Sequence, residues 1–127
     1  GEAEFRIKRL NQWVNAATAA LPSGAFEARE SAREVPRETP IVLFFDGSFN
    51  HDCTALLAAT VESTPHLFVV ECWERPIDDP GWRVDIGDVD RVARETCRDL
   101  KVVELACDPY RWAQIMAKAT ELGTHLF

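Results

Sequence analysis

The stretch that decides the fold is Pro40-Ile41-Val42-Leu43-Phe44-Phe45-Asp46-Gly47-Ser48, an apolar run that ends in a carboxylate and a turn. Such a continuous run predicts a strand from Ile41 to Asp46 that is covered on both faces. A second stretch of the same form is Val102-Val103-Glu104-Leu105-Ala106-Cys107-Asp108-Pro109. A carboxylate at the carboxyl end of a core strand lies at a sheet edge where ligands bind. The aspartates that close these runs are therefore the first candidates for a functional site.

Between the two runs, the sequence predicts two more strands and a helix. Thr54 to Val61 and Leu67 to Trp73 are apolar segments joined by short turns, which predicts an antiparallel meander in chain order. Apolar residues then recur at helical spacing from about Ile86 to Asp99, and again from about Tyr110 to Leu122 before Gly123. The succession of strand, helix and strand implies a right-handed crossover and a parallel pair.

This order of elements indicates an α/β fold of the ribonuclease H-like type. Three antiparallel strands are followed by a helix, a parallel strand and a helix in one mixed sheet, with the C-terminal part of the fold missing. In that topology the first and fourth strands are neighbours, so Asp46 and Asp108 are expected side by side. Residues 40–127 are predicted to form this partial domain, 22–39 a solvated linker and 1–21 an amphipathic helix.

Length and composition limit the classes of protein to which this chain can belong. Its 127 residues support one domain, and 46% hydrophobic with 28% charged residues is typical of a globular protein in water. No apolar run reaches the roughly 18 residues of a membrane span, so we expect no membrane partner and a cytoplasmic location. The net charge of −7 argues against an isolated DNA-binding module, unless metal ions bridge protein and phosphate or a larger protein supplies the basic surface.

Cysteine and histidine usage argues against a zinc site. The four cysteines form no CxxC pair and the three histidines are scattered along the chain. The cysteines are therefore expected to be small buried hydrophobic residues in a reducing compartment. The residues concerned are Cys53, Cys72, Cys97, Cys107, His51, His66 and His125.

The two strand-terminal aspartates predict a site for Mg²⁺ or Mn²⁺. Phosphodiester cleavage by two such ions needs several carboxylate oxygens within reach of both. Asp46, on the central strand, is the predicted bridging ligand, and Asp108 holds one metal from the neighbouring strand. Asp52 is a possible outer-shell ligand or hairpin cap. Gly47 lets the backbone turn sharply after Asp46, so that phosphate can approach.

Each of these residues also has a purely structural interpretation. Asp108 before Pro109 is a common helix start, with Asp as N-cap and Pro at the first helical position. Asp46 can equally be a turn residue. Glu71 and Glu104 are expected to face solvent, and Asp85, Asp88 and Asp90 to be charges at a helix start, on a solvated face.

Beyond these patterns, the chain resembles a known family, the nuclease half of the large terminase subunit of tailed double-stranded DNA bacteriophages of the prophage type. The likeness spans most of the chain in order. It is carried by Leu10-Asn11-Gln12-Trp13-Val14, Phe45-Asp46-Gly47-Ser48, Asp52-Cys53-Thr54-Ala55-Leu56, Cys107-Asp108-Pro109-Tyr110-Arg111-Trp112 and Glu121-Leu122-Gly123.

The resemblance implies a metal-dependent endonuclease that hydrolyses phosphodiester bonds during packaging of the viral genome. Asp46 and Asp108 match two of the family's metal-binding acids, and the third lies in a region beyond Phe127. Residues 1–21 would then connect to an ATPase part, and no Walker A motif occurs in the sequence. The implied partners are double-stranded DNA and other terminase and portal components, in the bacterial host cytoplasm.

Two alternatives stay open at this point. The chain can be a non-catalytic terminase remnant or assembly module that docks on a partner. Less favoured is an actin-like phosphate-binding fold, in which Asp46-Gly47-Ser48 before a hairpin presents a turn to ATP phosphates. That fold requires a second lobe, for which 127 residues leave no room.

Overall fold

The computed structural model describes residues 22, 24–48, 53–107, 112, 115–117 and 125–126. The chain divides into two compact units, residues 1–34 and 35–127. In the first unit, the described structure is one turn of 3-10 helix, η1 (Glu27–Arg29), none of whose residues is buried. The amphipathic helix expected within residues 1–21 lies outside the described residues.

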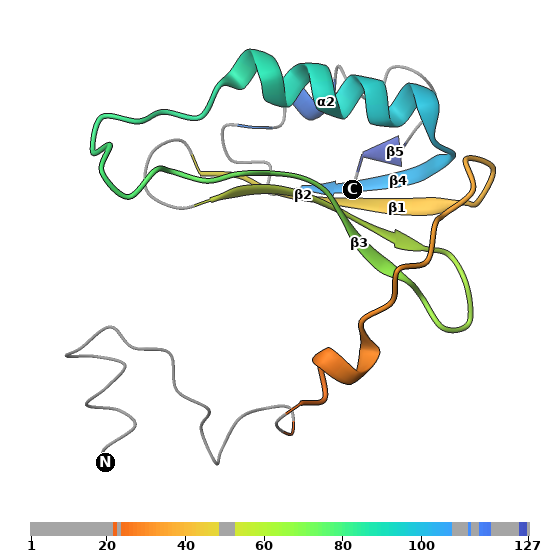
Figure 1. Cartoon of the computed structure of the whole chain (residues 1–127). Coiled ribbons are helices and arrows are strands. Elements are labelled where there is room, and N and C mark those ends of the chain that lie inside the picture. Colours follow the sequence, from red (N-terminus) through yellow and green to blue (C-terminus); the bar gives the residue numbers. More distant parts are fainter. Residues whose placement is uncertain are drawn as a thin grey trace. The chain divides into compact units, whose positions relative to one another are not determined.

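The second unit is an α/β structure built on one mixed sheet (Figure 1). Its strands are β1 (Ile41–Asp46), β2 (Thr54–Thr60), β3 (Leu67–Trp73), β4 (Val102–Cys107) and β5 (His125–Leu126), in the spatial order β3-β2-β1-β4-β5. The first three strands pair antiparallel, while β4 runs parallel to β1 and β5 parallel to β4. The predicted meander and the predicted parallel pair are both confirmed.

The bounds of β1 and β3 coincide with the predicted strands, and β2 ends one residue earlier than predicted, at Thr60. The short strand β5 was not predicted. Its two residues, His125 and Leu126, pair with Glu104 and Leu105 of β4. Two residues are too few for an alternating pattern, and they become a strand only because β4 offers an edge for pairing.

The crossover between β3 and β4 contains the helix α2 (Ile86–Asp99), as the periodicity predicts. Asp85 is its N-cap, and its carboxylate accepts a hydrogen bond of 3.1 Å from the backbone N–H of Asp88. On the solvent side, Arg91 forms ion pairs with Asp88 and Glu95. Such exposed pairs add little stability, so the helix is held mainly by its apolar side.

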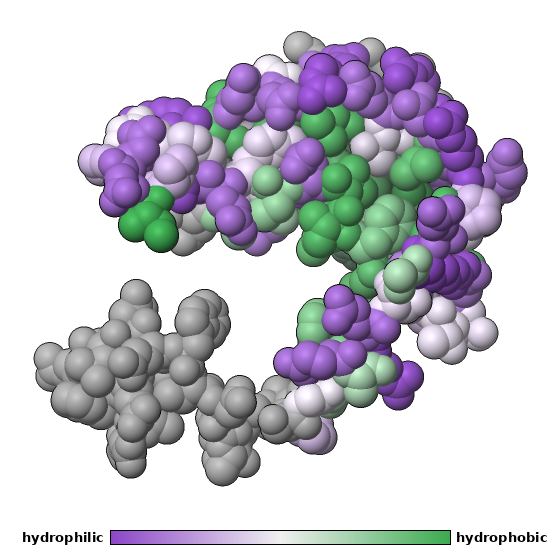
Figure 2. Space-filling view, in the orientation of Figure 1, coloured by the Kyte–Doolittle hydropathy of each residue, from purple (hydrophilic) through white to green (hydrophobic). Residues whose placement is uncertain are grey.

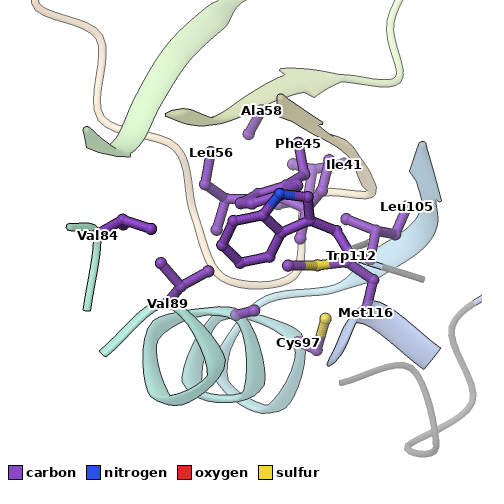
Figure 3. Close-up of a cluster of buried hydrophobic side chains, with 12 residues drawn as sticks. Ile41, Phe45, Leu56, Ala58, Val84, Val89, Cys97, Leu105, Trp112 and Met116 are labelled. Carbon is purple, nitrogen blue, oxygen red and sulfur yellow. The ribbon is translucent and has the colours of Figure 1, made fainter. Parts of the chain in front are cut away.

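That apolar side packs on one face of the sheet and forms the core with it (Figure 3). The alternating residues Ile41, Leu43 and Phe45 of β1 point into this core, as do Leu56 and Ala58 of β2. From the other side come Val89, Ala93 and Cys97 of α2. Each fully buried large side chain contributes about 1.5–3 kcal/mol by leaving water.

The opposite face of the sheet stays open in the described part of the chain, so the expectation that β1 is covered on both faces is wrong. Phe44 on β1 and Leu57 on β2 are 42% and 38% exposed, and Leu67 and Val69 on β3 are more exposed still. In the space-filling view, hydrophobic residues gather below the hydrophilic band over α2 (Figure 2). The apolar run therefore indicates only that β1 belongs to the sheet. The alternating burial along β1 shows that a helical layer covers one face of the strand.

The segment after β4 returns to the core. Trp112 is helical and 2% exposed, and residues 115–117 are helical, with Met116 fully buried. The remaining residues of the helix predicted from Tyr110 to Leu122 lie outside the described residues. Among the described helices, none is both long and apolar enough to cross a membrane.

Candidate functional site

The predicted site begins at Asp46, the last residue of β1. Because side chains alternate along a strand, Asp46 shares a face with Val42 and Phe44, which is the open face of the sheet. Its side chain is exposed, and its backbone partner on β2 is Ala55. A carboxylate in this position is accessible to a ligand from solvent.

The neighbouring strand β4 ends at the same edge of the sheet. It runs parallel to β1, and its last residue, Cys107, is the register partner of Phe45. Adjacent strands lie about 4.8 Å apart. In the sequence, Phe45 is followed by Asp46, the last residue of β1, and Cys107 is followed by Asp108. Asp108 itself lies outside the described residues, and so does Asp52, which precedes Cys53.

The turn after Asp46 is fixed by the first residue of β2. The Thr54 hydroxyl donates a hydrogen bond of 2.7 Å to the Ser48 carbonyl oxygen, and the Ser48 N–H donates one of 3.1 Å back to the Thr54 oxygen. Thr54 is fully buried, so its hydroxyl needs a partner within the protein, and losing that partner would be costly. This reciprocal pair holds the chain direction directly after the candidate carboxylate.

Gly47 is held by the indole of Trp112. The indole N–H donates a hydrogen bond of 3.2 Å to the Gly47 carbonyl oxygen. A Cβ at Gly47 would lie 2.5 Å from the indole nitrogen and 2.6 Å from the ring of Phe45. The ring of Phe45 packs edge-on against Trp112, with centroids 4.9 Å apart. Among the described glycines only Gly24 has a positive φ, so Gly47 is needed for close approach of the indole and not for the sharp turn that we expected.

The other acidic residues near the sheet do not join Asp46. Glu104 is half-buried and pairs with Val42, which lies four residues before Asp46 and so about 13 Å away along the strand. Glu71 is exposed, and its carboxylate accepts a hydrogen bond from the N–H of Cys72. Within the described ranges, no group of three or more potential ligands is close enough to hold a metal ion.

Of the three predicted ligands, the described residues include Asp46, whose carboxylate oxygens are donors of the kind that Mg²⁺ and Mn²⁺ prefer. The two other predicted ligands both fall among the residues that are not described.

The acidic residues at the start of α2 have structural partners, as expected. The Trp73 indole N–H donates a hydrogen bond of 2.8 Å to Asp88, which also pairs with Arg91. The hydrogen bond from Trp73, and next that from Arg91, lower the pKa of Asp88 below its ordinary value. Asp90 pairs with Arg94. The Asp88 carboxylate attaches α2 to Trp73 of β3, and Asp90 forms an ion pair on the partly exposed side of the helix.

The expectation that all four cysteines are buried is wrong for two of them. Cys97 is buried on α2 and Cys107 is partly buried, but Cys53 and Cys72 are exposed. The reason is the open face, since Cys72 pairs with Ala55, whose side chain points away from the core. A cysteine inside an apolar strand is buried only if its own face is covered.

No protein-family model matches this chain, and neither a curated protein nor a solved structure matches it significantly. The site is therefore interpreted from its own geometry.

Sequence reasoning missed the contacts of Thr54 and Trp112. The Thr54 hydroxyl binds the backbone 6 residues earlier, across the turn, and the Trp112 indole binds the backbone 65 residues earlier. In the sequence, Thr54 is an ordinary strand residue. Trp112 is predicted to be a core residue, and the structure confirms this. Only the polar atoms of these side chains, directed at Ser48 and Gly47, distinguish them from packing residues. A threonine at the start of a strand that follows a polar turn is the one sequence signal that could have been used.

Proposed function

We propose that the chain is a ribonuclease H-like, metal-dependent DNA endonuclease domain of a phage genome-packaging terminase. The single observation that carries the proposal is the parallel pairing of β1 with β4, in which Phe45 and Cys107 are register partners. β1 ends at Asp46, and in the sequence Asp108 follows Cys107, the last residue of β4. Two carboxylates from the same ends of adjacent parallel strands are a suitable pair of ligands for a divalent ion.

The sheet order supports the same proposal. The β3-β2-β1-β4 part of the sheet, an antiparallel meander followed by a strand parallel to β1, agrees with the order expected of a ribonuclease H-like sheet. The helix α2 lies in the crossover between β3 and β4, also as expected. Fold alone does not fix chemistry, so the acidic edge and not the topology carries the function.

In the proposed site, Asp46 and Asp108 hold Mg²⁺ or Mn²⁺, with Asp52 as an additional or outer ligand. Bound metal would supply a lowered pKa for the attacking water and stabilisation of the leaving oxygen. The chain's own part is to orient the carboxylates. Thr54 and Trp112 do this for Asp46 by fixing Ser48 and Gly47, the two residues that follow it.

A non-catalytic assembly module is the second candidate, and the open sheet face favours it. Phe44, Leu57, Leu67 and Val69 expose apolar surface on that face, which is unusual for a monomeric protein. In this alternative the fold serves a contact, and neither aspartate needs a metal.

Titration with Mn²⁺ distinguishes these two candidates. We would measure Mn²⁺ binding to the wild-type chain, to Asp46→Asn and to Asp108→Asn, and nicking of supercoiled plasmid DNA by the same proteins. Asp78→Asn is the matched control, since Asp78 is an exposed acid in the loop between β3 and α2. We expect each site variant to weaken binding by about tenfold or more, which is ~1.4 kcal/mol, and to lose nicking, while Asp78→Asn behaves as wild type.

A second pair of variants tests the orientation of Asp46. Thr54→Val removes the hydroxyl that binds Ser48, and Thr60→Val removes a buried hydroxyl at the other end of the same strand, where it binds Glu62 and the N–H of His66. Both should lower stability by about 1–3 kcal/mol. Only Thr54→Val should also weaken Mn²⁺ binding.

The proposal is wrong if the wild-type protein binds no Mn²⁺ while circular dichroism shows it to be folded. It is equally wrong if Asp46→Asn binds Mn²⁺ as the wild type does. Either result would leave the assembly module as the better description.

A further inference from the structure

The strand β3 forms one edge of the sheet (Figure 1), and no strand of the described part of the chain pairs with its outer side. β3 has seven residues, whereas β5, at the other edge, has two. A free edge presents unpaired backbone N–H and C=O groups, which another extended strand can bind. Very short edge strands are one way in which proteins avoid such pairing, so β3 is the edge at which we expect it.

The hydrogen bonds of His66 show which backbone groups of β3 face outward. The His66 carbonyl oxygen accepts a bond of 3.0 Å from the Thr60 N–H, and the His66 N–H donates one of 2.8 Å to the Thr60 hydroxyl. Both backbone groups of His66 therefore point toward β2. Since successive residues of a strand direct these groups to alternate sides, Leu67 and Val69 direct theirs away from β2. Outside the ladder between β2 and β3, no hydrogen bond from a described residue reaches Leu67 or Val69.

Further along β3, the edge is closed. The register with β2 skips Val70, which is therefore a bulge. The N–H of Cys72 donates a hydrogen bond of 3.0 Å to the carboxylate of Glu71, so it is already occupied. A bulge and a charged side chain both hinder pairing at an edge. The open part of the edge is thus limited to residues 67–69.

The side chains of this open part are apolar. Leu67 and Val69 lie on the open face of the sheet and are 69% and 62% exposed. Phe68, between them, is partly buried and packs against the core on the covered face. An exposed apolar edge strand with unpaired backbone groups is a site of association between chains.

We propose that residues 67–69 pair, in antiparallel orientation, with the same residues of a second copy of this chain. A two-fold axis at Phe68 places Leu67 of each copy opposite Val69 of the other. Each of these two opposed pairs then exchanges two backbone hydrogen bonds, which uses every outward N–H and C=O group of Leu67 and Val69. The contact is the same surface on both copies, so the association closes at a dimer.

This register also matches the side chains. Leu67 meets Val69 on the open face, and Phe68 meets Phe68 on the covered face, and such apolar cross-strand pairs stabilise a sheet. Glu71 of one copy falls opposite Pro65 of the other, so the two Glu71 residues are about 20 Å apart along the strands. The edge is therefore self-complementary in both its backbone groups and its side chains, which is why we assign it to a second copy.

The proposed dimer is weak and depends on salt. Pairing of so short an edge buries less than the roughly 1,200 Å² below which contacts are transient, so the dimer should dissociate on dilution. Each copy carries a net charge of −7, and the resulting repulsion is screened by salt. The proposal does not rest on nuclease function, because it involves only β3.

Sedimentation equilibrium of the full chain, from about 1 μM to about 1 mM, tests the proposal. We expect the mass to rise with concentration from 14.3 kDa toward twice that value. A tenfold increase in salt should shift this rise to lower protein concentration. The proposal is overturned if the folded chain keeps the monomer mass throughout, or if the mass passes twice the monomer value.

Two lysine substitutions locate the contact. Val69→Lys should raise the Kd of the dimer about tenfold or more, because pairing would remove a charged side chain from water. Ile77→Lys makes the same change of charge at a residue that is 96% exposed in the loop between β3 and α2, and it should dimerise as the wild type does. Circular dichroism confirms that both variants are folded. If Val69→Lys also associates as the wild type does, another surface is responsible and the proposal is overturned.

A second pair of variants tests the backbone hydrogen bonds. Leu67 is the first residue of β3, a position at which proline is tolerated. Leu67→Ala and Leu67→Pro both lose the leucine side chain, but only Leu67→Pro loses the outward N–H. We expect the Kd of Leu67→Pro to exceed that of Leu67→Ala by about tenfold or more. Equal values in two folded variants would show that this N–H forms no bond to a second copy, which would overturn the proposed pairing.

Discussion

The two faces of the sheet have nearly the same kind of sequence and very different surroundings. On the face toward α2, Leu43 and Leu56 are fully buried. On the other, Phe44 and Leu57, their immediate neighbours in the chain, are 42% and 38% exposed. The covered face is also the one into which Thr54 and Trp112 direct their polar atoms, while the open face carries Asp46 and Cys72. One face therefore holds the fold together, and the other exposes apolar side chains and the candidate ligand Asp46.

The largest effect is expected from adjacent leucines on the two faces. Leu56→Ala should lower the free energy of unfolding by about 2–5 kcal/mol, because it leaves a cavity in a closed core. Leu57→Ala should cost about 1 kcal/mol or less, since its side chain is partly in water already. Urea unfolding followed by tryptophan fluorescence measures both.

Equal losses of unfolding free energy in Leu56→Ala and Leu57→Ala would contradict the difference between the two faces. They would mean that Leu57 is buried in solution, by another part of the protein or by a second copy. Repeating the measurement at two protein concentrations separates those causes, because only association makes stability depend on concentration.

The next effect concerns the close approach of Trp112 to Gly47. Gly47→Ala should cost about 1–3 kcal/mol, because the new methyl group overlaps the indole and the ring of Phe45. Gly81→Ala is the control, since the nearest atom to its Cβ position is 3.6 Å away and belongs to the flexible side chain of Asp79. It should be nearly neutral. A neutral Gly47→Ala would show that Trp112 does not hold the turn after Asp46.

Most of the fold could be predicted because it is encoded locally. Apolar runs and turns predicted the bounds of β1 and β3, and helical periodicity predicted those of α2. Short connections imply antiparallel neighbours, and the topology expected from the order of elements places β4 beside β1. The bounds of the elements use information contained within a few residues of the chain.

What could not be predicted depends on distant partners. The exposure of Phe44 and Cys72 follows from the lack of a covering layer in the described chain, which no property of β1 or β3 encodes. The pairing of β5 with β4 depends on a free strand edge. At the candidate site, the aspartate could be singled out from its place in the strand. The hydrogen bonds that hold the two residues after it could not, because they are made by Thr54 and Trp112, whose roles depend on packing.

The smallest expected effect tests how α2 is kept on the covered face. The Trp73 hydrogen bond, followed by Arg91, lowers the pKa of Asp88 in the folded protein. A carboxyl group with a lowered folded-state pKa stabilises the protein above its unfolded-state pKa, and this stabilisation is lost as the pH falls through the folded-state pKa. Asp88→Asn should therefore lower Tm at neutral pH. The difference in Tm between the variant and the wild type should disappear as the pH is lowered below the usual pKa range of carboxyl groups.

Trp73→Phe supplies the control for that experiment, since it keeps an aromatic ring and removes the N–H that Asp88 accepts. In the Trp73→Phe background, Asp88→Asn should have a smaller effect on Tm at neutral pH, because the largest cause of the lowered pKa is gone. If the Tm difference caused by Asp88→Asn is independent of pH, or is unchanged by Trp73→Phe, then the hydrogen bond from Trp73 to Asp88 does not hold α2. The helix would then stay on the covered face through Val89, Ala93 and Cys97 alone, and the two faces would differ in packing but not in polar contacts.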